Sequence, residues 1–205
     1  MKAAIRLYGA ATGNCRRAAI ALMEAGIEFS AIRLDLRSGE HKRAAFLALN
    51  PRGLVPVLVE EREERADLIL TQSNAIMLHA ARRSHGGLGP DSGDAAERFF
   101  ERLFYFVTEV IAPSGNAFVL EREGEGWGAG LLAKRSTEAL SQAERFLDSS
   151  PFMAGDRFTL VDIAAYTVAS ATRDQLDWSS LPRLSAWYAG VGARPGVMRG
   201  MAVFA

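Results

Sequence analysis

Asn50-Pro51-Arg52-Gly53-Leu54-Val55-Pro56-Val57-Leu58 is the stretch that decides the fold of this chain. A proline has no N–H to donate to a sheet ladder, so Pro56 is expected to open a strand over 57–59. An X–Pro bond adopts the cis form at little cost. A cis bond before Pro56 would leave the N–H and C=O of Val55 free to pair with an extended peptide. Taken alone, however, these residues favour the simpler interpretation that Pro56 only starts a strand.

The composition indicates a globular protein with balanced charge. The chain has 205 residues, 49% of them hydrophobic, and 24 basic residues balance 24 acidic ones. This length suits one large domain or two small ones. A net charge near zero argues against nucleic acid or an anionic membrane as the main partner. We expect no bilayer-spanning run and no signal peptide, and therefore a soluble cytoplasmic protein.

The first half of the chain predicts an α/β domain. Its expected elements are a strand, a helix, a strand, a helix, two strands and a helix, over residues 4–8, 15–27, 29–36, 38–49, 57–59, 68–70 and 71–81. One crossover should give a parallel strand pair, and the charged hairpin at 60–65 should give an antiparallel edge. The last helix begins within Thr71-Gln72-Ser73-Asn74.

The second half predicts helices alone. A glycine-rich linker at 84–93 separates it from the first half, so the expected domains are 1–83 and 94–205. The predicted helices cover 94–120 with a bend at Pro113-Ser114-Gly115, then 131–147, a helix from 158, 182–191 and 195–201. Thr159 and Asp162 have the spacing of a capping box, flanked by the hydrophobic staple pair Phe158 and Ile163.

The end of the first strand could form one binding site with the starts of two helices, the one near Asn14 and the one at Ser73. Ligands bind at strand ends in open α/β sheets, and the helix that begins near Asn14 offers free N–H groups and a positive dipole end. At the second helix start, the backbone and the Ser73 hydroxyl could hold a carboxylate. With the turn at Pro56 between them, they describe a groove for a short acidic peptide, with a nucleophile near Thr12.

Three motifs in this order resemble the glutathione transferase superfamily, and the resemblance covers nearly the whole chain. The Pro56 segment is similar to the cis-proline segment of its thioredoxin-like domain. The run 70–76 resembles its glutamyl-binding helix start, in the form with Gln-Ser-Asn. Gly39-Glu40-His41 resembles the theta-like pattern, and the capping box resembles that of the family's helical domain. The resemblance implies a bacterial theta/nu-like member with an α/β thioredoxin-like domain and an all-α domain, glutathione as co-substrate, and a homodimer.

The resemblance leaves the residue that activates the thiol open. Tyr8 matches the tyrosine of tyrosine-type members, Thr12 the serine of theta- and zeta-like members, and Thr12 with Asn14 the pair of nu-like members. Cys15 falls one residue late for the cysteine types and should pack into its helix. We predict Thr12 with support from Asn14, and Tyr8 second. The residues expected to bind glutathione are His41, Leu54, Val55, Pro56, Gln72 and Ser73.

One hydroxyl and one helix end are sufficient for this chemistry. A free thiol has a pKa of about 8.5. A hydrogen bond to a charged group contributes about 1.5–3 kcal/mol, and a helix N-terminus about 0.3–1 kcal/mol. Together they lower the thiol pKa by roughly one and a half to three units. Most bound glutathione would then be a thiolate without a general base.

We therefore expect a glutathione S-transferase that conjugates the thiolate to a small electrophile. The alternatives are a glutathione-dependent disulfide reductase or isomerase, and a transferase-like domain kept for binding alone. No metal is expected, because the histidines do not cluster and the chain has a single cysteine. We place His79 on a helix surface and His85 in the linker. The aromatic stripe 99–106 should form core or a subunit contact, and Tyr105, Phe118 and Tyr166 are candidates for an apolar pocket for the second substrate.

Overall fold

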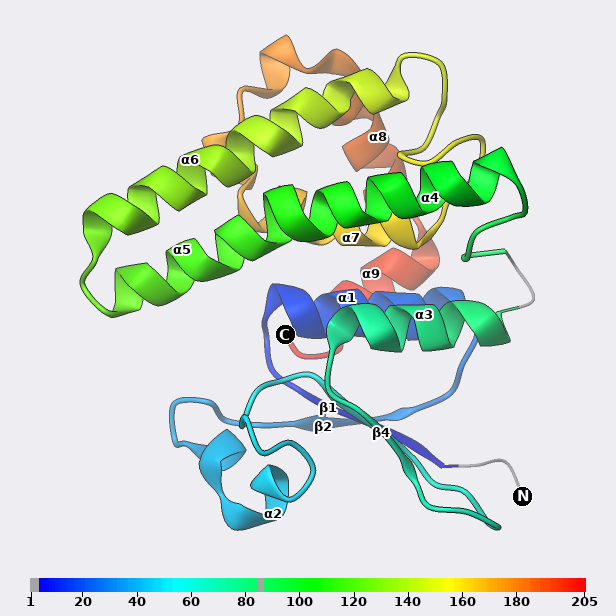
Figure 1. The fold of residues 1–205 in the computed structure, drawn as a ribbon, viewed down its shortest axis with the longest axis vertical. Helices are drawn as coiled ribbons and strands as arrows, with labels where there is room; N and C mark the ends of the chain where they lie inside the picture. The colour runs from blue at the N-terminus through cyan, green and yellow to red at the C-terminus, as the bar shows by residue number, and fades with distance from the viewer. Residues whose placement is uncertain (1–3, 85–86) are drawn as a thin grey trace. The chain divides into compact units, whose positions relative to one another are not determined.

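The computed structural model describes residues 4–84 and 87–205, which divide into two compact units. Unit 1 comprises residues 1–86 together with 195–205, and unit 2 comprises residues 87–194 (Figure 1). The predicted domain 94–205 differs from unit 2 at the end of the chain, because residues 195–205 pack in unit 1. Of the predicted linker 84–93, His85 and Gly86 lie outside the described residues.

Unit 1 is built on a mixed sheet whose strand order is β2-β1-β3-β4 within the described residues. The strands are β1 (Ile5–Gly9), β2 (Ser30–Arg33), β3 (Val57–Glu60) and β4 (Leu68–Leu70). β1 pairs in parallel with β2 and antiparallel with β3, which forms a hairpin with β4. The predicted strands and their pairing are thus confirmed, although β2 covers only part of the predicted 29–36.

Helices cover both faces of this sheet. α1 (Gly13–Glu24), α3 (Ser73–Arg83) and α9 (Pro195–Ala202) lie on one face, and the short η1 (Glu40–Lys42) and α2 (Ala44–Leu47) lie on the other (Figure 1). The predicted helix 38–49 is wrong in its length, because Arg43 has an extended conformation, with φ −70° and ψ 148°, and separates η1 from α2. Phe46 of α2 packs with Val57 and Val59 of β3.

The close approach of α9 to α1 explains why the end of the chain belongs to unit 1. A Cβ atom at Gly200 would lie 2.6 Å from the backbone Cα of Ile20, so only glycine fits there. The Phe204 ring is almost fully buried, and a Cβ atom at Gly9 would lie 2.6 Å from it. These contacts fix residues 195–205 to α1 and to the end of β1.

Unit 2 contains helices and no strand within its described residues. They are α4 (Asp94–Tyr105), η2 (Phe106–Ile111), α5 (Ala112–Arg122), α6 (Gly126–Gln142), η3 (Ala143–Leu147), α7 (Leu160–Ala171), η4 (Arg173–Gln175), η5 (Trp178–Ser180) and α8 (Pro182–Gly192). Nearly every residue of α7 is buried, so α7 forms the centre of this unit. The predicted capping box is confirmed at its start, where Thr159 and Asp162 exchange hydrogen bonds.

The helix predicted over 94–120 extends to Arg122 and changes its winding in the middle. The segment η2 is a π-helix, and it precedes Pro113 rather than coinciding with it. The hydroxyl of Ser136 donates to the carbonyl oxygen of Val110 at 2.8 Å and so satisfies one acceptor of this segment. By length and composition alone the helix 94–122 could cross a membrane, contrary to our expectation, but core helices of globular proteins meet the same test.

Candidate functional site

The start of α1 presents Thr12 as its N-cap. Thr12 has extended backbone angles, φ −117° and ψ 154°, and its Oγ1 accepts a hydrogen bond from the N–H of Cys15 at 3.3 Å. Because the oxygen acts as the acceptor in this cap, the hydroxyl hydrogen can be donated to another group. The first turn of α1 contains no acidic side chain, so nothing there competes for an anion.

The start of α3 is a second place suited to an anion. Ser73 is the first residue of α3 and is buried, whereas the N-cap residue Gln72 is exposed and makes no side-chain cap bond. The first turn of α3 also lacks an acidic residue. Its first backbone N–H groups therefore have no partner within the helix and point toward an incoming carboxylate.

A buried arginine joins these two helix starts. Arg17 of α1 is only 2% exposed, and its Nη1 donates to Asn14 Oδ1 at 2.7 Å and to Ser73 Oγ at 3.2 Å. Burial lowers the pKa of Arg17 to about 10. Arg17 thus forms hydrogen bonds to both of the predicted residues Asn14 and Ser73, which lie 59 positions apart in the sequence (73 − 14).

The loop from Asn50 to Pro56 has the conformation expected of it. The Val55–Pro56 bond is cis. Asn50 is buried, and its Nδ2 donates to the carbonyl of Leu54 at 2.7 Å while its Oδ1 accepts from the N–H of Arg52 at 3.2 Å. Among the described residues, neither the N–H nor the C=O of Val55 has a hydrogen-bond partner. An extended peptide could pair with these two groups.

His41 lies beside this loop. Gly53 has φ +60°, and a Cβ atom there would lie 2.8 Å from the carbonyl oxygen of His41, so η1 and the loop are in close contact. The Nδ1 of His41 is buried and has no hydrogen-bond partner within the described residues. The hydrogen-bonding capacity of this nitrogen is therefore unused within the described residues.

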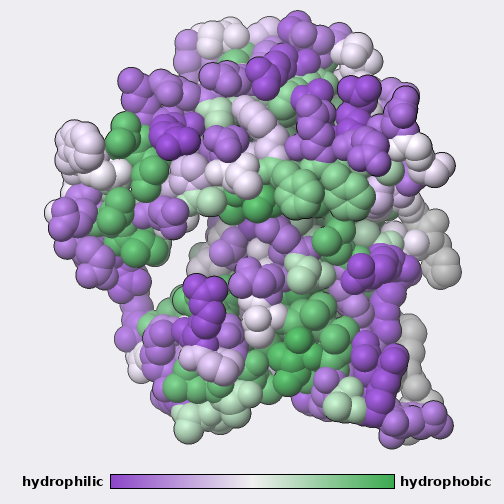
Figure 2. All heavy atoms as spheres, in the orientation of Figure 1, coloured by the Kyte–Doolittle hydropathy of each residue, from purple (hydrophilic) through white to green (hydrophobic). Residues whose placement is uncertain are grey.

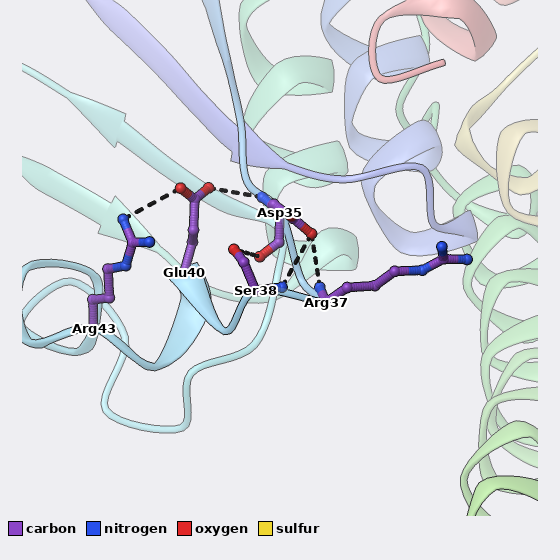
Figure 3. Close-up of polar contacts among 5 residues, drawn as sticks. All are labelled: Asp35, Arg37, Ser38, Glu40 and Arg43. Atoms are coloured by element: carbon purple, nitrogen blue, oxygen red, sulfur yellow. Dashed lines mark hydrogen bonds and ion pairs between the residues drawn. The ribbon is translucent and has the colours of Figure 1, made fainter.

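The turn that leads to His41 is braced by polar contacts. Asp35 Oδ1 accepts from the N–H groups of Arg37 and Ser38 at 2.8 and 3.2 Å, and the N–H of Asp35 donates to Glu40 Oε2 at 2.8 Å (Figure 3). The hydrogen bonds from Ser38 and Arg37 lower the pKa of Asp35. Glu40 also pairs with Arg43, whereas the side chain of Arg37 points away from the cluster (Figure 3).

Tyr8 packs against residues of α2 and β3. Its ring contacts Phe46 with a centroid distance of 6.2 Å, and it packs beside Val57 and Val59. Arg6 is a further neighbour, because Tyr8 adds to the effect of Glu61 in raising the pKa of that arginine. The side chain of Tyr8 therefore belongs to the cluster around Phe46, on the α2 side of the sheet.

The Cys15 thiol is fully buried, as expected. Its Sγ accepts a hydrogen bond from the N–H of Ala10 at 3.4 Å. Burial raises the pKa of this thiol above its ordinary value, and this effect outweighs the opposing effects of its neighbours Thr12, Ala10 and Arg17. Cys15 is therefore an unsuitable nucleophile for a ligand in solvent.

Two features of unit 1 were missed or wrongly predicted. Arg17 was not singled out, although Asn14 and Arg17 stand three residues apart on one helix face, a spacing that allows side chains to pair. His79 was expected on a helix surface, but it is 7% exposed and its Nε2 lies 3.4 Å from Glu60 Oε2. Arg62 and Arg83 also pair with Glu60.

The three aromatic residues proposed for a second-substrate pocket differ in their surroundings in unit 2. The Tyr105 hydroxyl donates to the carbonyl of Ala139 at 2.6 Å, Tyr166 stacks on Tyr188, and Phe118 is exposed. Two cavities of about 340 and 430 Å³ in this unit are lined by other residues. Of the aromatic stripe, Phe99 and Phe106 are core residues. No group of metal-binding side chains occurs among the described residues.

Comparisons with known proteins agree with this arrangement. Residues 13–83 match the family model described as glutathione S-transferase, N-terminal domain, and residues 116–199 match glutathione S-transferase, C-terminal domain. Glutathione S-transferase 3 of Zea mays is 30% identical, over 98% of this chain and 94% of that protein. A maleylacetoacetate isomerase of Rhizobium meliloti is 35% identical, over 83% of this chain and 82% of that protein.

A solved structure extends the likeness to the whole fold. The theta class glutathione S-transferase of Xanthomonas axonopodis pv. citri, crystallised with glutathione bound, superimposes with a TM-score of 0.83. The two chains are 27% identical, and the match covers 97% of each.

Proposed function

Because this chain belongs to the glutathione S-transferase family, we propose that it binds glutathione, stabilises the thiolate with Thr12 and Asn14, and conjugates it to a small electrophile. The observation that carries the proposal is the pair of helix starts linked through Arg17, with Thr12 on one and Ser73 on the other. The unpaired backbone of Val55 belongs to the same unit. Each part offers hydrogen-bond donors or acceptors that suit one group of a tripeptide.

The tripeptide is assigned to these groups from one end to the other. Its glutamyl carboxylate takes the start of α3, where Gln72, Ser73 and the free N–H groups lie. Its central peptide unit pairs with Val55, between Leu54 and Pro56, as an added strand does. Its glycine end reaches His41, whose Nδ1 lacks a partner within the described residues. The thiol then lies at the start of α1.

The chemistry needs no general base. The Thr12 hydroxyl and an Asn14 N–H donate to the sulfur, so the thiol loses its proton to water at neutral pH. The thiolate then attacks an electrophilic carbon, the S–C bond forms, and a leaving group departs with the electron pair of the bond that breaks. We assign Tyr8 second rank, because its ring packs with Phe46 of α2. This assignment corresponds to the theta/nu-like type.

A second candidate is a glutathione-dependent isomerase. The relative from Rhizobium meliloti that is named an isomerase has the higher identity of the two reported above, which favours this reaction. Thiolate addition to a cis double bond, rotation and loss of the thiolate would use the same groups. Assays with an aromatic halide, a maleyl substrate and a small disulfide separate conjugation, isomerisation and disulfide reduction.

We also propose a cytoplasmic homodimer. Hydrophobic surface gathers over α4 and near the ends of α5 and α6 that meet (Figure 2). On α4 the exposed Phe104 stacks on Phe100 with a centroid distance of 6.3 Å, and a second subunit could cover this pair. Light scattering measures the mass of the particle. A monomer at micromolar concentration would contradict the dimer.

The direct test of the function is titration with glutathione. We expect calorimetry to give a stoichiometry of one per chain, and thiolate absorbance to appear on binding at neutral pH. Binding without turnover of any of the three substrates would favour a non-catalytic role. Absence of heat, of thiolate absorbance and of a thermal shift would overturn the proposal.

A further inference from the structure

We propose that Arg17 is a positioning residue that orients Asn14 and Ser73 so that both present hydrogen-bond donors to bound glutathione. The inference rests on the proposed function and adds a residue to it. A single atom carries the arrangement, because Nη1 of Arg17 donates both to Asn14 Oδ1 at 2.7 Å and to Ser73 Oγ at 3.2 Å. Arg17 is 2% exposed, so this nitrogen is fixed within unit 1 rather than free in solvent.

The first consequence concerns the amide of Asn14. A guanidinium donates and never accepts, so the amide oxygen must face Arg17 and the amide nitrogen must face away. Asn14 is itself exposed at the start of α1. Its Nδ2 therefore has two N–H groups for a ligand, and a thiolate is an acceptor that matches them. With the amide reversed, the carbonyl oxygen would face the sulfur and repel it.

The second consequence concerns the hydroxyl of Ser73. Its oxygen accepts from Arg17, so its hydrogen is directed to another acceptor. At the first position of α3, where no acidic side chain lies in the first turn, that acceptor would be the glutamyl carboxylate of the tripeptide. Arg17 thus directs a hydrogen-bond donor outward at both places. The donor of Asn14 faces the thiolate, and the donor of Ser73 faces the glutamyl carboxylate.

The charge of Arg17 supports this role. Burial lowers its pKa to about 10, yet it remains protonated at neutral pH. Its positive charge lies within hydrogen-bond distance of Asn14 and Ser73, so it attracts anions that bind near these two side chains. A thiolate and a carboxylate are both such anions.

A purely structural role makes a different prediction. If Arg17 only ties α1 to α3, its loss lowers stability but leaves the pKa of a bound thiol unchanged. We therefore compare Arg17→Met with the matched control Arg16→Met, the neighbouring arginine of α1, which makes no hydrogen bond to Asn14 or Ser73 among the described residues. Two ligands separate the two effects, because S-methylglutathione reports carboxylate binding without a thiol, and the thiolate absorbance of glutathione against pH reports the sulfur.

We expect Arg17→Met to weaken binding of S-methylglutathione at least about tenfold and to raise the bound-thiol pKa by about one unit. Arg16→Met should match the parent protein in both. In a double-mutant cycle, Arg17→Met should add little to the thiol pKa in an Asn14→Ala background, and little to the ligand affinity in a Ser73→Ala background. This non-additivity is the signature of an effect transmitted through those side chains.

Additive effects in both cycles, or an unchanged thiol pKa in a folded Arg17→Met protein, would overturn the inference. If Arg17→Met does not fold, Arg17→Lys keeps the buried charge but lacks the guanidinium that reaches both oxygens. We expect Arg17→Lys also to raise the bound-thiol pKa and to weaken the binding of S-methylglutathione. If both quantities equal those of the parent protein, the inference is overturned. Failure of the parent protein to bind glutathione would instead overturn the proposed function, so the two outcomes are distinct.

Discussion

Thr12 combines two tasks in one side chain. Its oxygen caps α1 by accepting from Cys15 N–H, and its hydrogen is left for a ligand. We predict that Thr12→Ala raises the bound-thiol pKa by about one to two units and lowers kcat/KM about 10- to 100-fold at neutral pH. The measurement is thiolate absorbance and turnover against pH.

The control for this variant is Thr12→Ser, which keeps both the cap and the hydroxyl. It should retain most activity, whereas Thr12→Ala should also lose about 0.5–2 kcal/mol of stability with the cap. If Thr12→Ala keeps the parent thiol pKa and Tyr8→Phe raises it, the activating role passes to Tyr8.

His79 makes the stability of the protein depend on pH. Burial lowers its pKa below the ordinary value of 6.5, helped by Arg83 and only partly opposed by Glu60. Because the unfolded chain binds a proton near pH 6.5 and the folded protein does so only at lower pH, the free energy of unfolding falls as the pH falls through this window.

We predict that His79→Gln removes this component of the pH dependence. Urea unfolding between about pH 5 and 8 measures it, since this interval spans the titration of an ordinary histidine. The difference in unfolding free energy between the parent protein and the variant should shrink as the pH falls. Parallel curves over the whole interval would show that His79 is not the group responsible.

These residues also mark where prediction from the sequence succeeded and where it could not. The expected behaviour of Cys15 followed from its register in α1, which placed it inside the helix packing. The burial of His79 depended on Glu60, which lies 19 positions earlier (79 − 60) and reaches it only through the folded sheet. A charged residue in a buried place is recognisable only when its partner is known.

At the scale of elements, the start of α7 illustrates a local motif that the sequence specifies only in part. Asp162 Oδ2 accepts from the N–H of Thr159 at 2.9 Å, and its Oδ1 accepts from Met153 N–H and from Trp187 Nε1, each at 2.9 Å. The spacing of Thr159 and Asp162 predicted the cap, but the two bonds to Oδ1 come from segments that sequence spacing does not identify.

We predict that Asp162→Asn lowers stability by about 2–4 kcal/mol, because an amide nitrogen would face at least one N–H donor and leave it unpaired. Chemical unfolding followed by the fluorescence of the tryptophans measures the loss. Asp156→Asn, at an exposed position on the turn before α7, is the control and should stay within about 0.5 kcal/mol of the parent protein. Equal stability of the two variants would contradict the role of Asp162.

Short elements were harder to predict than long ones. The apolar pattern at 38–49 suggested one helix, but Gly39 at φ +77° and the extended Arg43 limit it to two turns, η1 and α2. The π-helical η2 is likewise invisible to a pattern that assumes a constant period. Such irregularities depend on packing and hydrogen bonds such as that from Ser136, which the local sequence does not encode.

At the scale of the whole molecule, the division into units depends on the last eleven residues, 195–205. We predict that removing residues 195–205 destabilises unit 1, because α1 loses its cover where Gly200 meets Ile20 and where Phe204 is buried. The expected result is a lower melting temperature and loss of glutathione binding. Gly200→Leu should also lower the melting temperature and weaken glutathione binding, because the leucine side chain would overlap the backbone of α1.

The control is Gly190→Leu, in α8 of unit 2, where an added Cβ atom meets nothing within 4 Å. Binding of glutathione that survives the truncation unchanged would contradict the structural role of α9. The sequence predicted the helix at 195–201 but not its place, because proximity along the chain assigned it to the helical half. The pocket for the electrophile could not be predicted either, because the aromatic residues chosen for it also make contacts within unit 2. Tyr105 donates a hydrogen bond to the backbone of α6, and Tyr166 stacks on Tyr188 of α8.

The return of α9 to unit 1 has a consequence for how the protein is made. A ribosome releases the chain from its N-terminus, so the sheet with α1 and α3 emerges early, and all of unit 2 is synthesised before α9 can arrive. Throughout that interval the surface of α1 around Ile20 stays bare. A nascent chain that stalls before Pro195 therefore carries an uncovered hydrophobic flank, which makes it a target for chaperones and proteases.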